Sequence, residues 1–324
     1  MKKNLIGIDI GGTKCAVIYG RMDGNSLEIV DKIKFPTAEA GPTLENIKRH
    51  TAELMSRCGL SSGNTDAIGV SCGGPLDSEK GIIKSPPNLK GWDDIPIVDI
   101  LAETFGVRTA LQNDANACAL AEWKFGAGQG SRNMIFLTFG TGLGAGLIID
   151  GRLFSGTNGN AGEVGHIRLS GFGPVGYGKS GSFEGFCSGG GIAQLARTRI
   201  DEQFQMGRKV SFCASRAEMA SVTAQTVAEA AKAGDELARE IYEISGEYLG
   251  RGLSVLIDTL NPDTIVIGSI FARSGELLIP AMKRALEREA LPVAYSVCRI
   301  VPALLGDAVG DYASLSVAAD ALGV

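Results

Sequence analysis

The chain has 324 residues, of which 44% are hydrophobic and 21% charged, so it can bury a large core, and its length favours two domains. Its net charge of −5 and its scattered basic residues argue against a protein that coats nucleic acid. Glycine is unusually common, because 45 residues are about twice the usual share. Glycines without a repeat predict tight turns and close approaches of the backbone to a ligand.

Membrane insertion and secretion are also disfavoured. The most apolar stretch, residues 134–149, is short and is interrupted by four glycines. The apolar start of the chain ends at Asp9, too early for a signal peptide, so we interpret it as a mature N-terminus. The seven cysteines are odd in number, widely spaced and without a CxxC pair, which is typical of reduced thiols in a cytoplasmic protein.

One pattern of elements occurs twice. Near the N-terminus a strand over 5–9, a glycine turn, a second strand over 15–19 and an Asp-Gly turn predict an antiparallel hairpin. The same order recurs over 135–151. Two copies of one unit, one in each half of the chain, predict two similarly built domains.

Elsewhere helices alternate with strands. The spacing of apolar residues predicts helices over 44–58, 97–105, 117–125 and 215–260 and a last one from about residue 310, with strands over 67–71, 108–112 and 264–268. This alternation predicts helices packed over mixed sheets. Because no Pro/Ser-rich linker is present, we expect the domains to be hinged rather than tethered.

The two glycine turns could hold phosphate. Residues 140–145 fit the G-x-G-x-x-A form of the dinucleotide fingerprint, but that fingerprint needs a helix next, and here a second strand-like run follows. We therefore reject a Rossmann-type NAD site. The turns could instead present backbone N–H groups and the hydroxyls of Thr13 and Thr141 to one polyphosphate. They could also be ordinary hairpin turns.

Two polar segments are candidates for chemistry. Asp114 comes directly after a predicted strand, where ligands bind in α/β proteins, and it could accept a proton from an attacking hydroxyl. Asp or Asn there could equally cap the helix that follows. His166, one of two histidines, follows Glu163 in a Gly- and Asn-rich loop, which favours a binding loop, although a lone histidine is often a packing residue.

Together these segments resemble the ROK family of sugar kinases and sugar-responsive repressors, particularly its glucokinase-like members. The resemblance covers essentially the whole length, and its segments are residues 9–14, 74–77, 87–92, 113–116, 140–144, 162–166 and 261–268. It implies an α/β fold of two actin-like ATPase-type domains, of the ribonuclease H-like kind, around a central cleft. The smaller domain would be residues 1–112 completed by the C-terminal helix 305–324, and the larger one residues 113–304.

The resemblance also implies an activity: a cytoplasmic, ATP-dependent and Mg²⁺-dependent hexose kinase that transfers the γ-phosphate to a sugar hydroxyl, with glucose as the leading substrate. Asp114 would be the general base. The hexose hydroxyls would be bound by Asn88, Asn113, Glu163, His166 and Glu184. The phosphates of ATP would lie against Gly11, Gly12, Thr13, Gly140, Thr141 and Gly142. Gly268 would line the adenosine pocket, and Asp9 would help to hold Mg²⁺ through water.

The sequence departs from the family pattern in two places. Members usually carry three cysteines that bind a structural zinc with the signature histidine, but Val175, Tyr177 and Ser182 stand at those positions, so no structural zinc is expected. We expect Val175, Tyr177 and Phe183 to pack into the space of the metal. Ser269 replaces a second glycine after Gly268, which leaves nucleotide preference less secure than sugar binding.

Alternatives remain for the substrate and for the function. The sugar could be fructose, mannose, N-acetylmannosamine or a glucoside. A sugar-sensing regulator would carry a DNA-binding module before the first phosphate motif, and the motif begins within the first ten residues. A non-catalytic relic is disfavoured by intact Asp114, and an acetate or glycerol kinase would lack the segment from Glu163 to His166. We expect a homodimer with no nucleic-acid or membrane partner.

Overall fold

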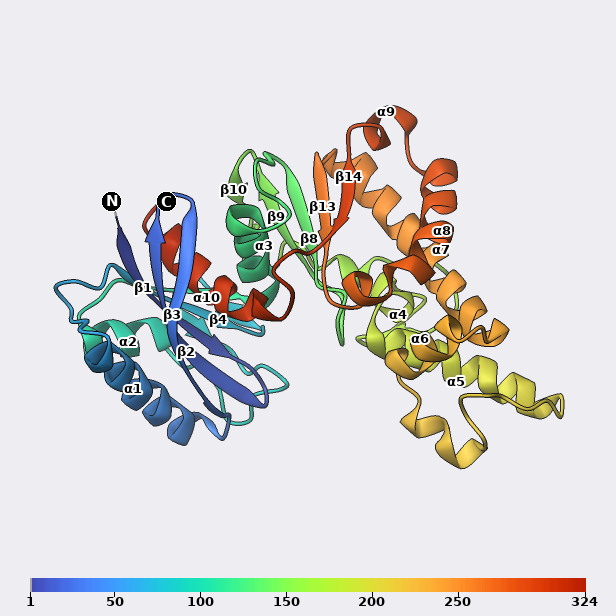
Figure 1. The fold of residues 1–324 in the computed structure, drawn as a ribbon, viewed down its shortest axis with the longest axis horizontal. Coiled ribbons are helices and arrows are strands. Elements are labelled where there is room, and N and C mark those ends of the chain that lie inside the picture. The colour runs from blue at the N-terminus through green and yellow to red at the C-terminus, as the bar shows by residue number, and fades with distance from the viewer. Residues whose placement is uncertain (1) are drawn as a thin grey trace. The chain divides into compact units, whose positions relative to one another are not determined.

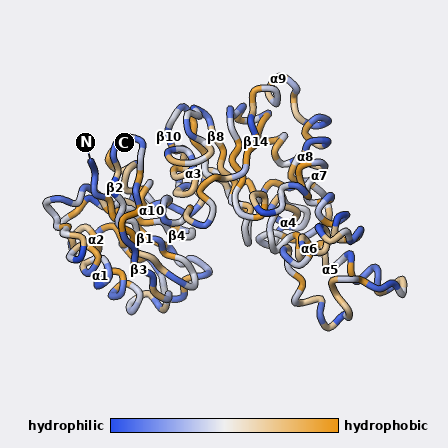
Figure 2. The backbone as a smooth tube through the Cα atoms, viewed as in Figure 1, coloured by the Kyte–Doolittle hydropathy of each residue, from blue (hydrophilic) through white to orange (hydrophobic). Residues whose placement is uncertain are grey.

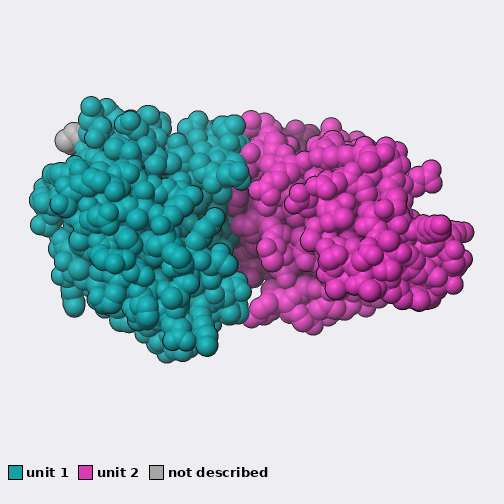
Figure 3. All heavy atoms as spheres, turned by 60° about the horizontal axis from the view of Figure 1, so that its bottom comes forward, with its two compact units in different colours: residues 1–132, 146–161, 304–324 teal, residues 133–145, 162–303 magenta. Residues whose placement is uncertain are grey.

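The computed structural model describes residues 2–324 (Figure 1). The chain forms two compact units, which Figure 3 colours separately. Unit 1 contains the chain up to Arg132 together with Gly146–Ala161 and Leu304–Val324, and unit 2 contains Asn133–Ala145 and Gly162–Ala303. The chain therefore passes between the units several times.

A five-stranded sheet forms the centre of unit 1, in the order β3-β2-β1-β4-β7. The strands are β1 (Lys3–Ile10), β2 (Lys14–Asp23), β3 (Ser26–Pro36), β4 (Ala67–Cys72) and β7 (Thr109–Asn113). The first three form an antiparallel meander, and β4 and β7 run parallel to β1. Unit 1 also holds the short pairs β5 (Leu76–Asp77) with β6 (Ile82–Ile83), and β9 (Ala145–Ile149) with β10 (Arg152–Leu153).

Helices cover both faces of this sheet. Because strand side chains alternate between faces, Ile6 and Ile8 join one core with residues of α1 (Ala40–Arg57) and α2 (Ile97–Phe105). Leu5 and Ile18 join a second core with α10 (Val309–Ala321). Figure 2 shows the hydrophobic colour concentrated along β1, β2 and α10. The remaining helix, α3 (Asp114–Phe125), follows β7 directly.

Helix α10 touches the backbone of the sheet. A Cβ atom on Gly69 would lie 2.2 Å from the carbonyl oxygen of Ser314 and 2.3 Å from the nitrogen of Ala318. A Cβ on Gly7 would lie 2.3 Å from Oγ of Ser314. Positions 7 and 69 therefore have to be glycine for the helix to lie where it does.

A buried carboxylate fixes the segment that leads into α10. Glu122 of α3 is fully buried and accepts hydrogen bonds from the backbone nitrogens of Leu304 (3.2 Å) and Leu305 (2.9 Å). It also accepts one from the nitrogen of Ala127 at 2.8 Å. Three N–H donors compensate the loss of hydration that would otherwise make this buried charge costly.

Unit 2 contains three parallel strands, β8 (Met134–Leu137), β13 (Thr264–Ile267) and β14 (Arg299–Pro302), with β13 between the others. Its helices are α4 (Phe183–Phe186), α5 (Gly189–Gln205), α6 (Ala224–Lys232), α7 (Glu236–Leu260), α8 (Ile270–Glu289) and α9 (Pro292–Tyr295). A small hairpin joins β11 (Val175–Gly176) to β12 (Lys179–Ser180). Short 3₁₀ helices of unit 2 lie at Val164–His166 and Arg216–Ser221, and a third one, Gly306–Ala308, belongs to unit 1.

Most predicted elements are present, but the long helical stretch is divided. Between 215 and 260 the chain forms a 3₁₀ turn, α6 and α7, and Gly234 with a φ of 102° separates the two helices. The second glycine turn leads into strand β9, as predicted, and not into the helix that the dinucleotide fingerprint requires. The predicted domain division after residue 112 stays a prediction, and the compact units count α3 with the first sheet.

Within residues 2–324, we find no helix that combines the length and the apolar character needed to cross a bilayer.

Replacing Gly69 tests the contact between α10 and the sheet. Gly69→Ala forces backbone atoms of α10 away, so we expect the free energy of unfolding to fall by about 1–3 kcal/mol, measured by urea denaturation. Gly41→Ala is the matched control, because a Cβ at this position of α1 meets nothing within 4 Å and alanine favours helix. Equal stability of the two variants would contradict the close contact.

Candidate functional site

The first glycine turn connects β1 to β2 and is held by its backbone. The nitrogen of Gly11 donates to the carbonyl of Lys14 at 3.1 Å, and Oγ1 of Thr37 donates to the carbonyl of Gly11 at 2.6 Å. Gly12 and Thr13 are exposed. A Cβ on Gly12 would lie 3.0 Å from Cβ of Asn88, so this turn and the segment of Asn88 are in contact. The turn therefore exposes Gly12 and Thr13 beside Asn88.

The polar residues of unit 1 gather at one edge of its sheet. Asp9 lies near the end of β1, and Asn113 ends β7, with β4 parallel to both strands between them. Carboxyl ends of parallel strands are the usual place for ligands in α/β folds. The structure therefore brings Asp9, Asn113 and Asp114 to the same edge.

Asn113 caps helix α3. Its Oδ1 accepts a hydrogen bond from the nitrogen of Asn116 at 2.8 Å, which leaves Asp114 as the first residue of the helix. The Oδ1 of Asp114 accepts from the nitrogen of Ala115 at 2.8 Å. Asp114 retains an exposed side, yet the protein packed around its carboxyl group raises the pKa of that group by desolvation. Of the two alternatives for Asp114, capping is thus the task of its neighbour.

Two further carboxylates lie near Asp9. Burial, together with the nearby carboxylates of Asp311 and Asp114, raises its pKa to about 6. A Cβ on Gly310, in the first turn of α10, would lie 3.0 Å from Oδ2 of Asp9. Asp311 itself forms an ion pair with Lys32 of β3. Carboxylate oxygens are the donors that Mg²⁺ prefers, and the excess negative charge favours a cation beside Asp9.

In unit 2, Glu184 is tied to the second glycine turn. Its Oε2 accepts a hydrogen bond from the nitrogen of Leu143 at 3.0 Å, and a Cβ on Gly142 would lie 2.9 Å from the same oxygen. A Cβ on Gly165 would lie 2.2 Å from the carbonyl oxygen of Leu143. The structure therefore brings together the turn 140–144, the segment 162–166 and Glu184, which are far apart in sequence.

His166 lies at the end of a 3₁₀ turn and contacts the hairpin β11–β12. Its ring centroid is 5.1 Å from that of Tyr177, with the rings at 76°. Nζ of Lys179 donates to the carbonyl oxygen of His166 at 2.7 Å. Glu163 precedes the same turn and is exposed.

The expected packing in the zinc-like frame is wrong for two of its three residues. Phe183 is fully buried, but Val175 is 46% exposed and Tyr177 79% exposed, because both belong to a surface hairpin. Ser182 caps α4 by accepting a hydrogen bond from the nitrogen of Gly185 at 3.1 Å. Across residues 2–324, no group of three or more His, Cys, Asp and Glu side chains is placed to hold a metal.

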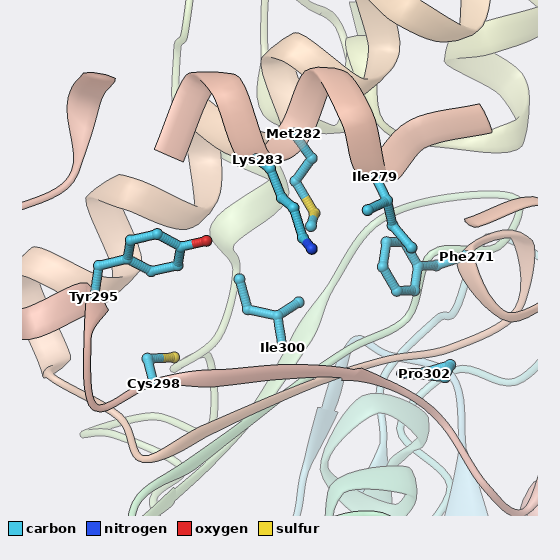
Figure 4. Close-up of a pocket in the computed structure, with 8 residues that line it drawn as sticks. All are labelled: Phe271, Ile279, Met282, Lys283, Tyr295, Cys298, Ile300 and Pro302. Atoms are coloured by element: carbon cyan, nitrogen blue, oxygen red, sulfur yellow. The ribbon is translucent and has the colours of Figure 1, made fainter. Parts of the chain in front are cut away.

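Gly268 is buried at the end of β13, and its carbonyl accepts a hydrogen bond from the nitrogen of Phe271 at 3.2 Å. Phe271 also lines a pocket of about 230 Å³ between α8, α9 and β14 (Figure 4). The pocket is largely apolar, with Lys283 and Tyr295 at one side. Its lining includes none of the predicted site residues within the part of the chain that the structure describes.

Sequence reasoning missed two features. The ion pair between Lys32 and Asp311 joins residues 279 positions apart, and no local pattern indicates it. The contact of Tyr177 and Lys179 with His166 was also missed, because tyrosine is not a typical first residue of a two-residue hairpin turn.

Comparisons with known proteins agree with one another. The ROK family profile matches residues 5–319. A glucokinase of Halalkalibacterium halodurans is 34% identical over 294 residues, 89% of this chain and 86% of that protein. The crystal structure of a ROK hexokinase from Thermus thermophilus has a TM-score of 0.79 at 29% identity and covers 100% of this chain and 99% of that one.

A ROK family glucokinase of Streptomyces griseus, solved with glucose and AMPPNP, has a TM-score of 0.72 at 28% identity and covers 98% of this chain and 99% of that one. These likenesses confirm the predicted actin-like ATPase-type fold. The transcriptional repressor Mlc of Escherichia coli is 29% identical over 256 residues, 79% of this chain and 61% of the repressor.

Replacing Asp9 tests the charge around it. The raised pKa means that the folded protein binds this proton more tightly than the unfolded chain, so stability falls as pH rises from 3.8 to about 6 and stays lower above that. Asp9→Asn removes the charge. We expect the free energy of unfolding to rise by about 1–3 kcal/mol at pH 7.5, and by much less at pH 4, in denaturation without nucleotide or Mg²⁺.

Asp77→Asn is the control for this experiment. A hydrogen bond from the nitrogen of Lys80, with help from Lys84, lowers the pKa of Asp77, so its removal should reduce stability at pH 7.5. An Asp9→Asn variant that is destabilised equally at both pH values would rule out the proposed environment of Asp9.

Proposed function

The chain belongs to the ROK family, and on that premise we propose that it is an ATP-dependent hexose kinase whose sugar is glucose. The predicted family and the predicted class of enzyme, a sugar kinase, are confirmed by its relatives. One observation carries the proposal. Asp114 lies at the carboxyl end of β7 and is not needed to cap α3, because Asn113 caps that helix.

Asp114 would take the proton of the attacking sugar hydroxyl. A general base works best when its pKa lies near the working pH, and desolvation moves the pKa of Asp114 upwards. The hydrogen bond from the nitrogen of Ala115 holds one carboxylate oxygen in place, and the other would face the sugar hydroxyl. Phosphoryl transfer needs positioning and charge neutralisation more than covalent chemistry, so one such base suffices.

Both units contain residues that we predict to bind the phosphates of ATP. Gly11, Gly12 and Thr13 belong to unit 1, while Gly140, Thr141 and Gly142 belong to unit 2, with Gly268 expected beside adenosine. When bound with ATP, Mg²⁺ would neutralise phosphate charge, and Asp9 would hold it through water. The raised pKa of Asp9 supports this role, since a cation would relieve the crowding of its carboxylate.

The predicted sugar ligands are Asn88, Asn113, Glu163, His166 and Glu184. Asn113 uses its Oδ1 for capping, so its NH₂ group is the part that would donate to a sugar hydroxyl. Glu184 uses one oxygen for the second glycine turn, which would couple the sugar to the phosphate side of the site. Dense hydrogen bonding of this kind orients the reacting hydroxyl.

Glucose is the hexose that the glucokinase relatives support. The repressor relative keeps a regulator as the rival, and ADP release separates the two. Homodimer formation and a cytoplasmic location stay predictions, the first testable by light scattering. The absence of a nucleic-acid partner also stays a prediction.

Replacing the base tests the mechanism. Asp114→Asn keeps the shape of the side chain but cannot take the proton, so we expect kcat to fall about 10²- to 10⁴-fold in a coupled ADP-release assay with glucose. Glucose binding, measured by calorimetry, should persist. Asp99→Asn is the matched control, because Asp99 is also an exposed carboxylate in the first turn of a helix of unit 1.

A variant that keeps more than roughly a tenth of the wild-type kcat would remove Asp114 from the mechanism. Wild-type protein that binds glucose but releases no ADP would favour the regulator.

Zinc content tests the altered frame around Ser182. We expect elemental analysis to find no stoichiometric zinc, and activity to survive a chelator once Mg²⁺ is restored, because Val175 and Tyr177 cannot replace thiolate ligands. About one zinc per chain would contradict this expectation.

A further inference from the structure

The hairpin β11–β12 has a loop of two residues. Val175 pairs with Ser180 and Gly176 with Lys179, so Tyr177 and Gly178 alone form the turn. Both have positive φ, 42° and 75°. This is the pattern of a type I′ turn, whose first position favours Asn, Asp or Gly.

Tyrosine at this position is not explained by the turn. The hairpin β9–β10 has the same two-residue loop, and there Asp150 (φ 52°) precedes Gly151 (φ 72°). Asp tolerates the left-handed region, whereas a bulky residue with positive φ is strained. Such strain persists where something other than the local fold selects the residue.

Burial does not explain the tyrosine either. Tyr177 is 79% exposed, so it contributes little to a core. Its ring meets His166 edge-on, at 5.1 Å between centroids, which leaves most of its surface open beside a residue that we expect to bind the sugar.

The hairpin is nevertheless firmly placed. Lys179 binds the carbonyl of His166 at 2.7 Å, and Nη1 of Arg168 donates to the carbonyl of Ser180 at 2.7 Å. The nitrogen of Val175 donates to Oε1 of Gln194 on α5 at 2.5 Å. An aromatic ring on such a support is preorganised, and it loses little freedom when a ligand stacks on it.

We infer that Tyr177 is a specificity-determining residue, whose open ring takes the second ring of a glycoside or disaccharide while the first ring binds beside His166. The inference rests on the proposed function and extends it from the hexose to the group that the hexose carries. The apolar face of a sugar ring or of a phenyl group suits the face of an aromatic side chain.

The test compares two-ring ligands with glucose. The probes are cellobiose, maltose and phenyl β-glucoside, with binding measured by calorimetry and turnover by ADP release. In Tyr177→Asn, which suits the turn as Asp150 does, the preference for at least one two-ring probe over glucose should fall about two- to tenfold. Tyr177→Phe keeps the ring and should keep the preference.

Phe172→Ala is the matched control, because Phe172 is also 79% exposed in the loop before the hairpin and has no ring contact with His166 among the described residues. It should leave the preference unchanged. The melting temperature of Tyr177→Asn should equal or exceed that of the wild type, because the strain is relieved.

If the preference changes less than about twofold for every probe, the inference is overturned. The proposed kinase function stands in that case, provided that glucose is still turned over. A loss of preference together with a lower melting temperature also overturns it, because the role would then be structural. Wild-type protein that binds no hexose overturns both the proposed function and this inference.

Discussion

Much of unit 1 depends on how closely α10 approaches the sheet. The helix can reach the backbone of β1 and β4 because Gly7 and Gly69 offer no side chain. The close approach of α10 to the sheet determines where Gly310 contacts Asp9 and where Asp311 pairs with Lys32. A helix displaced by one methyl group would open both contacts, so the electrostatics of Asp9 follow from packing further along the same face of the helix.

The charges at this edge of the sheet work against the stability of the unliganded fold. The charges of Asp311 and Asp114 oppose the ionisation of Asp9, and within residues 2–324 only Lys32 forms a direct ion pair with a member of this group. A binding site for Mg²⁺ and phosphate benefits from such crowding, because the ligand's cation relieves a repulsion that already exists. The repulsion that destabilises the unliganded site would therefore add to its affinity for a cation, as expected where function and stability compete.

Local patterns were sufficient for the elements that carry the site. The runs 5–9 and 108–112 predicted the two strands, and Asp9, Asn113 and Asp114 at their ends proved to lie at one edge. The features that local patterns did not predict are contacts between residues far apart in sequence and the conformation of a single turn. The pairing of Lys32 with Asp311 is set by the assembled sheet. Val175 and Tyr177 were expected inside because they replace metal ligands, yet two-residue strands have too few side chains to define a buried face.

We predict that no zinc holds the frame around Ser182, so the loop beside His166 needs other anchors. A zinc ion would fix its ligands through four strong bonds at one point. Here Lys179, Arg168 and Gln194 distribute the same task over separate hydrogen bonds, each worth about 0.5–3 kcal/mol. Each of these bonds has a backbone group of the hairpin or of His166 as one partner. They therefore do not depend on which residue type stands at position 177. A loop anchored in this way can change the residue at its tip without losing its position, which makes the tip a natural place for specificity to diverge.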